Sequence, residues 1–152
     1  AEAALRRHHA SNEPACMLML DIDHFKEIND AHGHTVGDEV IRALAHVVRG
    51  NVRAGDCAGR YGGDEFAIVL PGMLAKDALA IAHRIREQTE GVRLRSLPGV
   101  RITSSIGVAP ADHRHSNLRA WIDAADAALY AAKNDGRNRV AGCMEPALAP
   151  AV

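Results

Sequence analysis

Two short acidic stretches contain the residues of this chain best suited to chemistry. "DIDHFKEIND" begins at Asp21, directly after the apolar run "ACMLML", and "RYGGDEF" places Asp64 and Glu65 behind two glycines. Carboxylates held close together repel one another, and a divalent cation removes that conflict. Asp and Glu oxygens, with room for water and phosphate oxygens, are the ligands that Mg²⁺ prefers. The pattern predicts a magnesium site for a phosphate-bearing ligand, which Gly62 and Gly63 would allow to approach closely.

Each of these residues also has an ordinary structural explanation. Asp and Glu in turns are usually solvated turn formers, and a D-x-D pattern is weak evidence when it stands alone. The combination of a strand that ends in D-I-D with a G-G-D-E-F turn is what favours a shared site.

A sheet is needed to bring the two stretches together. The continuous apolar run over 15–22 follows Pro14 and predicts a buried strand. Strand-like runs over 57–61 and 65–70 flank the double glycine, which predicts a hairpin with a tight primed turn of positive backbone angles. If the first strand pairs beside the hairpin, Asp21, Asp64 and Glu65 meet at one edge of the sheet.

The remaining elements follow from periodicity and caps. Helices are predicted over 1–12, 24–30, 36–49 and 75–90, with Thr35 as the cap of the third. A last long helix begins after the cap Ser116 and ends at Gly136, which serves as a left-handed stop. Further strands are predicted over 100–108 and 138–143. This order predicts an α+β domain with a mixed, largely antiparallel sheet covered by helices.

Composition limits the class of protein. The 152 residues suit a single domain over 1–152, and a net charge of −1 argues against DNA, RNA or membrane contact, which needs a basic surface. Cys16, Cys57 and Cys143 are expected to be buried thiols in a reducing compartment. With no signal peptide or membrane span in the sequence, we expect a cytoplasmic domain. We expect residues 1–13 to be the remnant helix, and 143–152 the frayed tail, of a piece excised from a longer signalling protein.

Three segments together resemble a known family. "MLDIDHFKEINDAHGHTVGDEV", "RYGGDEF" and "ADAALYAAKNDGRNRV" resemble the GGDEF family of diguanylate cyclases, and the match covers about residues 14 to 142. The resemblance implies the ferredoxin-like core of nucleotide cyclases, with a five-stranded sheet. It also implies condensation of two GTP into cyclic di-GMP with release of two pyrophosphates. A homodimer is implied because one domain holds one GTP.

The resemblance implies roles for individual residues. Asp21, Asp64 and the backbone carbonyl of Ile22 would hold Mg²⁺, with Mn²⁺ as the alternative cation. Glu65 would be a second or supporting ligand, and Asp64 also the base for the attacking 3′-hydroxyl. The positions implied to contact phosphate or stabilise the transition state are Lys26, Lys133 and Arg137.

Base recognition and product inhibition are implied in the same way. Asn29 and Asp38 match the guanine-binding positions, and His34 matches another substrate-binding position. A carboxylate accepts from guanine N1 and N2, whereas adenine presents an acceptor there. Without the resemblance, Asp38 is equally well explained as a capping-box partner of Thr35. Arg53 and Asp56 form an RxxD pattern that marks the family's inhibitory product site, and Arg84 would be a second contact there.

Two other functions compete with a cyclase. One is a catalytically silent domain that binds cyclic di-GMP or GTP and signals through protein contact. The other is a related enzyme that makes a different product, such as a mixed purine dinucleotide. The complete set of acidic and basic positions favours the cyclase over the receptor, and Asp38 weighs against adenine.

Overall fold

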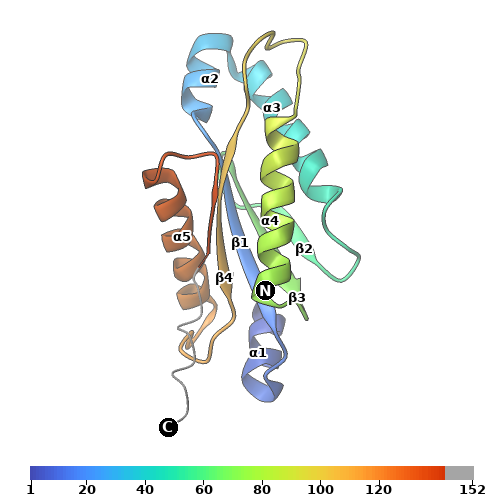
Figure 1. Ribbon diagram of the computed structural model, residues 1–152, viewed down its shortest axis with the longest axis vertical. Coiled ribbons are helices and arrows are strands. Elements are labelled where there is room, and N and C mark those ends of the chain that lie inside the picture. Colours follow the sequence, from blue (N-terminus) through green and yellow to red (C-terminus); the bar gives the residue numbers. More distant parts are fainter. Residues whose placement is uncertain (143–152) are drawn as a thin grey trace.

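The computed structural model describes residues 1–142, and one sheet with flanking helices accounts for most of them. In chain order the elements are α1 (Glu2–Ser11), β1 (Ala15–Ile22), α2 (Phe25–His32), α3 (His34–Arg49), β2 (Cys57–Arg60), β3 (Glu65–Pro71), α4 (Ala75–Glu90), β4 (Ser104–Pro110), α5 (Leu118–Asn134) and β5 (Val140–Gly142). The predicted element order is confirmed, and Figure 1 shows the arrangement.

The sheet has five strands in the order β2-β3-β1-β4-β5. β1 lies at its centre, antiparallel to both β3 and β4, and the one parallel pair is β4 with β5. Every residue of β1 is buried, as its continuous apolar run predicts, because helices cover both faces of a central strand. The fold is therefore α+β with a mostly antiparallel mixed sheet, as predicted.

Two apolar cores hold the helices against the sheet. On one face, α3 and α4 pack over alternate β1 residues such as Leu18 and Leu20. On the other face, α5 and α1 pack over the intervening residues Met17 and Met19, with Trp121 fully buried among them. In Figure 1, α4 and α5 accordingly lie on opposite sides of the strands. This layering brings the C-terminal end of α5 close to the end of β1.

The strand predicted over 100–108 has different bounds. β4 begins at Ser104, which pairs with Ile22, the last residue of β1. The chain turns away after Ile22, so the pairing ends with one bond from the Asp23 amide to the Thr103 carbonyl (3.0 Å), and residues 100–102 lie beyond the end of β1. At its other end β4 extends to Pro110, opposite Cys16. The length of the neighbouring strand, which periodicity in one segment does not reveal, sets both limits.

Both predicted helix caps are wrong. α3 begins at His34, directly after Gly33 with its φ of 86°, so Thr35 lies inside the first turn and caps nothing. The capping-box explanation of Asp38 fails with it. At α5 the cap is Asn117, one residue later than predicted, whose side chain accepts a hydrogen bond from the Ala120 amide at 2.9 Å. The left-handed stop is confirmed, since Gly136 follows α5 with a φ of 115°.

The hairpin is confirmed, but its predicted turn is wrong. Residues 61–64 connect β2 to β3, and neither Gly62 nor Gly63 adopts a positive φ. The prediction of buried thiols holds for Cys16 and is wrong for Cys57, which lies exposed on the edge strand β2. Cys143 and the predicted tail over 143–152 lie outside the described residues.

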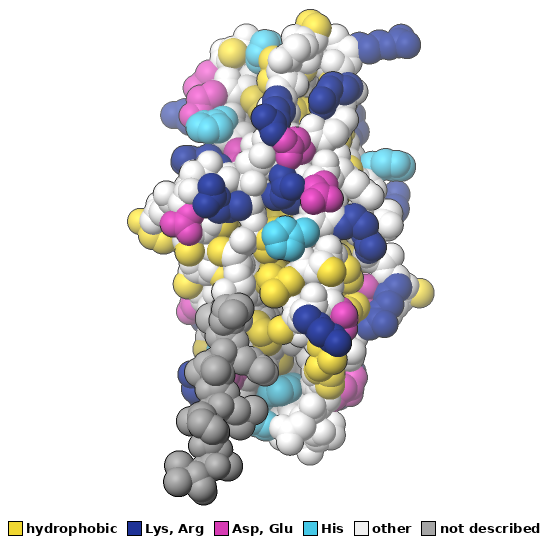
Figure 2. Space-filling model, in the orientation of Figure 1, with side chains coloured by type: hydrophobic (Ala, Val, Ile, Leu, Met, Phe, Trp, Pro, Cys, Tyr) yellow, Lys and Arg dark blue, Asp and Glu magenta, His cyan; other side chains and the backbone are white. Residues whose placement is uncertain are grey.

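The surface shown in Figure 2 carries mixed charge. On the face that includes α4, Lys and Arg side chains are interspersed with Asp and Glu. Within residues 1–142, no helix combines the length and the hydropathy needed to cross a membrane.

Candidate active site

The end of β1 and the hairpin turn meet as the sequence predicts. Asp21 pairs with Glu65 in the β1–β3 register, and the Ile22 amide donates to the Asp64 carbonyl at 3.4 Å. Asp21 and Asp64 therefore line one cavity of about 190 Å³. Its other lining residues come from the β1–α2 connection, α2, α5 and the segment before β5: Ile22, Asp23, His24, Phe25, Lys26, Glu27, Lys133 and Arg137.

Two neighbouring carboxylates, those of Asp21 and Asp64, make this cavity suitable for a cation. Burial raises the pKa of Asp21 to about 7, and the nearby Asp64 carboxylate acts in the same direction. The Lys133 ammonium, at the end of α5, forms an ion pair with Asp21 and opposes this rise. A buried carboxylate beside a second one retains its proton unless positive charge is supplied. The site therefore favours a positive charge beside Asp21, and the Lys133 ammonium supplies part of that charge.

The oxygen donors fit a hard divalent ion that completes its shell with ligand atoms. Among the described residues, no group of three or more His, Cys, Asp or Glu side chains is arranged to hold a metal. The carboxylates of Asp21 and Asp64, in a cavity that Ile22 also lines, match the way Mg²⁺ is usually bound, through one or two carboxylates plus substrate phosphates and water. The residues present therefore fit the implied ion, provided that phosphate is bound too.

Glu65 lies on the same face of the sheet as Asp21 but faces a second cavity. That cavity, of about 440 Å³, is lined by Glu65, Asp123, Asp126, Ala127, Leu129, Tyr130 and Lys133. Burial, followed by the nearby Asp123, raises the pKa of Asp126 there. Lys133 lines both cavities. Glu65, the cross-strand partner of Asp21, thus lines a cavity that adjoins the one lined by Asp21 and Asp64.

Asp23 joins three segments beneath the site. Its carboxylate is buried and accepts three hydrogen bonds. The donors are the hydroxyls of Thr103 (2.8 Å) and Ser105 (2.7 Å) and the backbone amide of Asn138 (2.9 Å). These bonds connect the end of β1 to β4 and to the segment that carries Arg137. Because one side chain satisfies three donors, Asp23 fixes where Arg137 enters the cavity.

We expect Asp23→Ala to lower the free energy of unfolding by about 2 kcal/mol, because the buried Ser105 hydroxyl and the partly buried backbone amide of Asn138 lose their partner. The KM for a phosphate-bearing substrate should also rise as Arg137 is released. Asp23→Asn is the matched control: its oxygen can face Asn138 while the Ser105 hydroxyl rotates to accept from the amide nitrogen. Urea unfolding and substrate titration measure both effects. Equal losses in the two variants would contradict this hydrogen-bonding role.

Backbone strain gathers around the same cavity. His24, Arg137 and Asn138 all have positive φ angles, of 56°, 63° and 46°. Residues other than glycine avoid this region, and such conformations persist where the surrounding structure holds them, often at functional sites. Here the hydrogen bond from Asn138 to Asp23 helps to hold the strained segment.

The predicted base-binding residues lie at the junction of α2 and α3. Asn29 sits against Gly37, where a β-carbon would lie 1.9 Å from the Asn29 Oδ1 atom, so no larger residue fits. That oxygen is buried without a hydrogen-bond partner in the described structure. Asp38 follows Gly37 and is exposed, as is His34 at the start of α3. Asn29 therefore lies against the residue that precedes Asp38.

Arg60 fixes the hairpin turn from the last position of β2. Its Nε atom donates to the carbonyls of Gly62 (3.2 Å) and Gly63 (2.8 Å). The Tyr61 amide closes the turn by donating to the Glu65 carbonyl at 2.8 Å. The side chain of Arg60 thus holds the backbone that presents Asp64.

The RxxD residues form a separate site on the loop between α3 and β2. The backbone amide and Nε of Arg53 donate to the Asp56 carboxylate at 2.9 and 3.2 Å, and its Nη2 donates to the Pro71 carbonyl at 2.7 Å. Asp56 is almost fully covered, whereas 58% of the Arg53 side chain remains exposed. Arg84 on α4 donates to Asn51 at the start of this loop, at 2.5 Å. The three predicted residues are therefore brought to one region.

Comparison with known proteins identifies the family. The family model described as "Diguanylate cyclase, GGDEF domain" matches residues 1–139. The chain belongs to the GGDEF family. This GGDEF domain is 46% identical over 134 residues to the probable diguanylate cyclase DgcC of Escherichia coli, covering 88% of the chain and 35% of that protein. It is 40% identical over 144 residues to the response regulator PleD of Caulobacter vibrioides, covering 93% of the chain and 32% of PleD. The domain thus spans about a third of the length of these relatives.

Solved structures of GGDEF domains agree with the fold. The coiled coil and GGDEF domain of DgcB from Caulobacter crescentus, in complex with c-di-GMP, matches with a TM-score of 0.87 and 34% identity, over 93% of this chain and 76% of that one. The active GGEEF domain of a diguanylate cyclase from Vibrio cholerae matches with a TM-score of 0.87 and 32% identity, over 95% and 92%. The sheet and helices of this GGDEF domain are therefore those of the family.

Sequence reasoning missed two residues that position the site of this GGDEF domain. Asp23 was visible as the second acid of D-I-D, and strand alternation places its side chain on the opposite face from Ile22. Its partners, however, lie 80 and more residues away in sequence. Arg60 directly precedes the turn in the sequence, but only the turn's geometry reveals its carbonyl partners.

Proposed function

We propose that this domain is a diguanylate cyclase that condenses two GTP molecules into cyclic di-GMP and releases two pyrophosphates. The observation that carries the proposal is the convergence of Asp21, Asp64 and Lys133 on one cavity. Membership of the GGDEF family supports it, as does the naming of its relatives as diguanylate cyclases.

Asp21, Asp64 and the Ile22 carbonyl would hold Mg²⁺, or Mn²⁺ in its place. The bound ion supplies positive charge to the triphosphate oxygens and so stabilises charge that develops in the transition state. Lys133, which pairs with Asp21 when no cation shares the carboxylate, is then free to bind phosphate. Lys26 and Arg137 add positive charge from two other sides of the cavity.

The reaction joins each 3′-oxygen to the α-phosphorus of the other GTP. The bond from that phosphorus to the pyrophosphate oxygen breaks, and the 3′-hydroxyl proton leaves. Asp64, carried on the turn that Arg60 fixes, is the group we propose to accept this proton. One domain holds one GTP, so two copies must face each other for the ring to close.

Guanine would be read by Asn29 and Asp38. The Oδ1 of Asn29 is buried against Gly37 without a partner, so the Asn29 side chain would have to turn away from Gly37 before this oxygen could accept a hydrogen bond from the base. The exposed carboxylate of Asp38 can accept from guanine N1 and N2, and His34 stands close by in sequence on the same helix. A site built on acceptors rejects adenine because adenine presents an acceptor of its own at that edge.

The direct test is incubation of the domain with GTP and Mg²⁺, followed by chromatographic separation of the products. We expect cyclic di-GMP and pyrophosphate in a 1:2 ratio. If the domain stays silent even when fused to a dimerising coiled coil, yet binds cyclic di-GMP through Arg53, it is a receptor and the cyclase proposal fails.

We propose that Arg53, Asp56 and Arg84 form an inhibitory site for the product. Arg53 is exposed and can reach a phosphate or guanine's Hoogsteen edge, whereas Asp56 must first release Arg53 to accept from a base. GGDEF domains solved with c-di-GMP support this ligand class.

Arg53→Ala should therefore raise the cyclic di-GMP concentration for half inhibition by at least about tenfold, since a charged hydrogen bond contributes about 2 kcal/mol. The measurement is the initial rate against added product, with Arg119→Ala on α5 as the control. Equal sensitivity of Arg53→Ala and the wild type would remove the inhibitory site from this account.

A further inference from the structure

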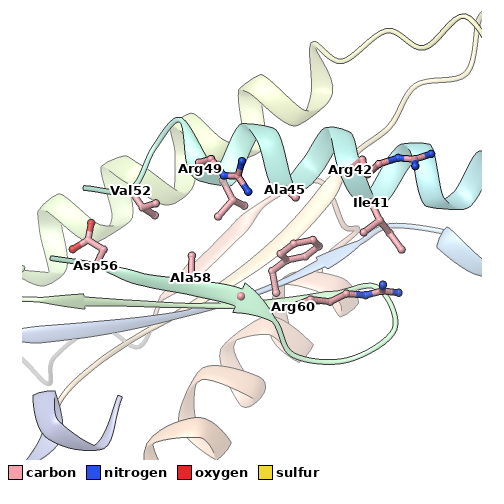
Figure 3. A pocket seen from close by; sticks show the side chains of 11 residues that line it. Ile41, Arg42, Ala45, Arg49, Val52, Asp56, Ala58 and Arg60 are labelled. Carbon is pink, nitrogen blue, oxygen red and sulfur yellow. The ribbon is translucent and has the colours of Figure 1, made fainter. Parts of the chain in front are cut away.

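A groove lies between α3 and the edge strand β2; it shares no lining residue with the cavity proposed for the phosphates of GTP, and it shares Asp56 with the proposed inhibitory site. Its volume is about 450 Å³, within the range of sites for small organic ligands. The groove exists because small residues face one another across it: Ala45 on α3, and Ala58 and Gly59 on β2. Figure 3 shows Ala45 on the helix and Ala58 on the strand, at different points along the groove between them.

The walls of this groove are apolar and its polar lining is mostly basic. The apolar lining is Ile41, Ala45, Val48, Val52, Ala58 and Phe66. Three arginines and one aspartate line the same space: Arg42, Arg49, Arg60 and Asp56. In Figure 3, Arg42 and Arg60 lie at one end, from α3 and β2 respectively, and Asp56 lies at the other.

Two of the arginines form no ion pair with an acid in the part of the chain that the structure describes. Within residues 1–142, neither Arg42 nor Arg49 has a hydrogen bond or ion pair from its side chain. Arg60 uses its Nε atom on the turn carbonyls, which leaves the rest of its guanidinium for another partner. The chain as a whole carries a net charge of −1, so this local excess of positive charge is a property of the groove.

We propose that the groove binds a small anionic amphiphile, with its acid group between Arg42 and Arg60 and an aromatic or acyl body over Ala45. The apolar walls account for the body, and the arginines account for the acid group. This site goes beyond the proposed cyclase function. The groove is also linked to the cyclase site through Arg60. An occupant that draws Arg60 away from the carbonyls of Gly62 and Gly63 would loosen the turn before Asp64 and lower turnover.

The test uses 8-anilinonaphthalene-1-sulfonate, an aromatic sulfonate whose fluorescence rises in apolar surroundings, with the native domain and no GTP. We expect saturable binding of one molecule per chain. The uncharged analogue N-phenyl-1-naphthylamine should bind at least about tenfold more weakly, since one lost charge contact of about 1.4 kcal/mol gives that factor.

Variants locate the binding. Ala45→Leu fills the groove, and the double change Arg42→Gln with Arg49→Gln removes charge without touching the core. Each should weaken binding of the sulfonate at least about tenfold, whereas Arg119→Gln on the opposite face of the sheet should leave it unchanged. With GTP present, the sulfonate should lower turnover of the wild type and leave that of Ala45→Leu unaffected.

Three results would overturn the proposal: equal binding of the uncharged analogue, binding that Ala45→Leu does not weaken, and self-association of the chain that Ala45→Leu abolishes. The last would assign the groove to a second copy. Sulfonate binding requires neither GTP nor Mg²⁺, so this test can fail or succeed independently of any test of cyclase activity.

Discussion

Asp64→Asn is expected to lower cyclic di-GMP formation from GTP by at least about 10³-fold. The change keeps the size of the side chain and the fold of the turn but removes one of the two carboxylates that we propose to bind the cation, in the cavity that Lys133 also lines. A charge contact to a metal and phosphate is worth several kcal/mol in the transition state, and each 1.36 kcal/mol is a factor of ten in rate. The turn should persist, since Arg60 holds it through Gly62 and Gly63.

Asp126→Asn is the matched control for this prediction. Asp126 lies in the neighbouring cavity, which shares Lys133, and it is half-buried like Asp64. Its loss should change turnover by less than about tenfold. Chromatographic measurement of product, with thermal melting to confirm folding, distinguishes the two variants. Retention of more than a tenth of the activity in Asp64→Asn would contradict the assigned role.

The second large effect is on stability. We expect Gly107→Ala to lower the free energy of unfolding by about 3 kcal/mol, at the upper end for overpacking. A β-carbon on Gly107 would lie 2.2 Å from the Leu129 amide nitrogen and 2.4 Å from the Ala125 carbonyl oxygen. Both atoms belong to the α5 backbone, which cannot turn aside as a side chain can. Accommodation therefore requires α5 to move away from β4.

Gly59→Ala provides the control, because a β-carbon there meets nothing within 4 Å. It too is a strand glycine without a positive φ. Urea unfolding should show a loss for Gly107→Ala and little change for Gly59→Ala. Since α5 carries Lys133, any folded Gly107→Ala protein should also bind GTP less well. A stable Gly107→Ala protein would mean that the close packing of α5 on β4 is not required.

The elements could be predicted because each has a local signal. The apolar run of β1, the helical spacing of α3 and α4 and the two runs around the double glycine suffice to give the order and the sheet class. The meeting of Asp21 and Asp64 follows from placing β1 beside the hairpin. The sequence does not reveal which of the two adjoining cavities Glu65 lines, because this depends on the orientation of one side chain.

Other features depend on contacts that no segment encodes by itself. Gly107 shows only that a small residue interrupts an apolar strand, and its contact with α5 appears only in three dimensions. Asp23 gains its role from residues on β4 and before β5. The cap of α3 was mispredicted because Gly33, at the end of α2, already starts the next helix. The start of β4 is limited by the end of its neighbour β1.

Binding of Mn²⁺ in the presence of a non-hydrolysable GTP analogue tests the central claim most directly, because Asp21 and Asp64 are proposed to share one cation. Electron paramagnetic resonance of free Mn²⁺ gives the affinity of the wild type, Asp21→Asn and Asp64→Asn. We predict one tightly bound ion in the wild type and an affinity at least about tenfold lower in each variant. Unchanged Mn²⁺ affinity in both variants would contradict the account.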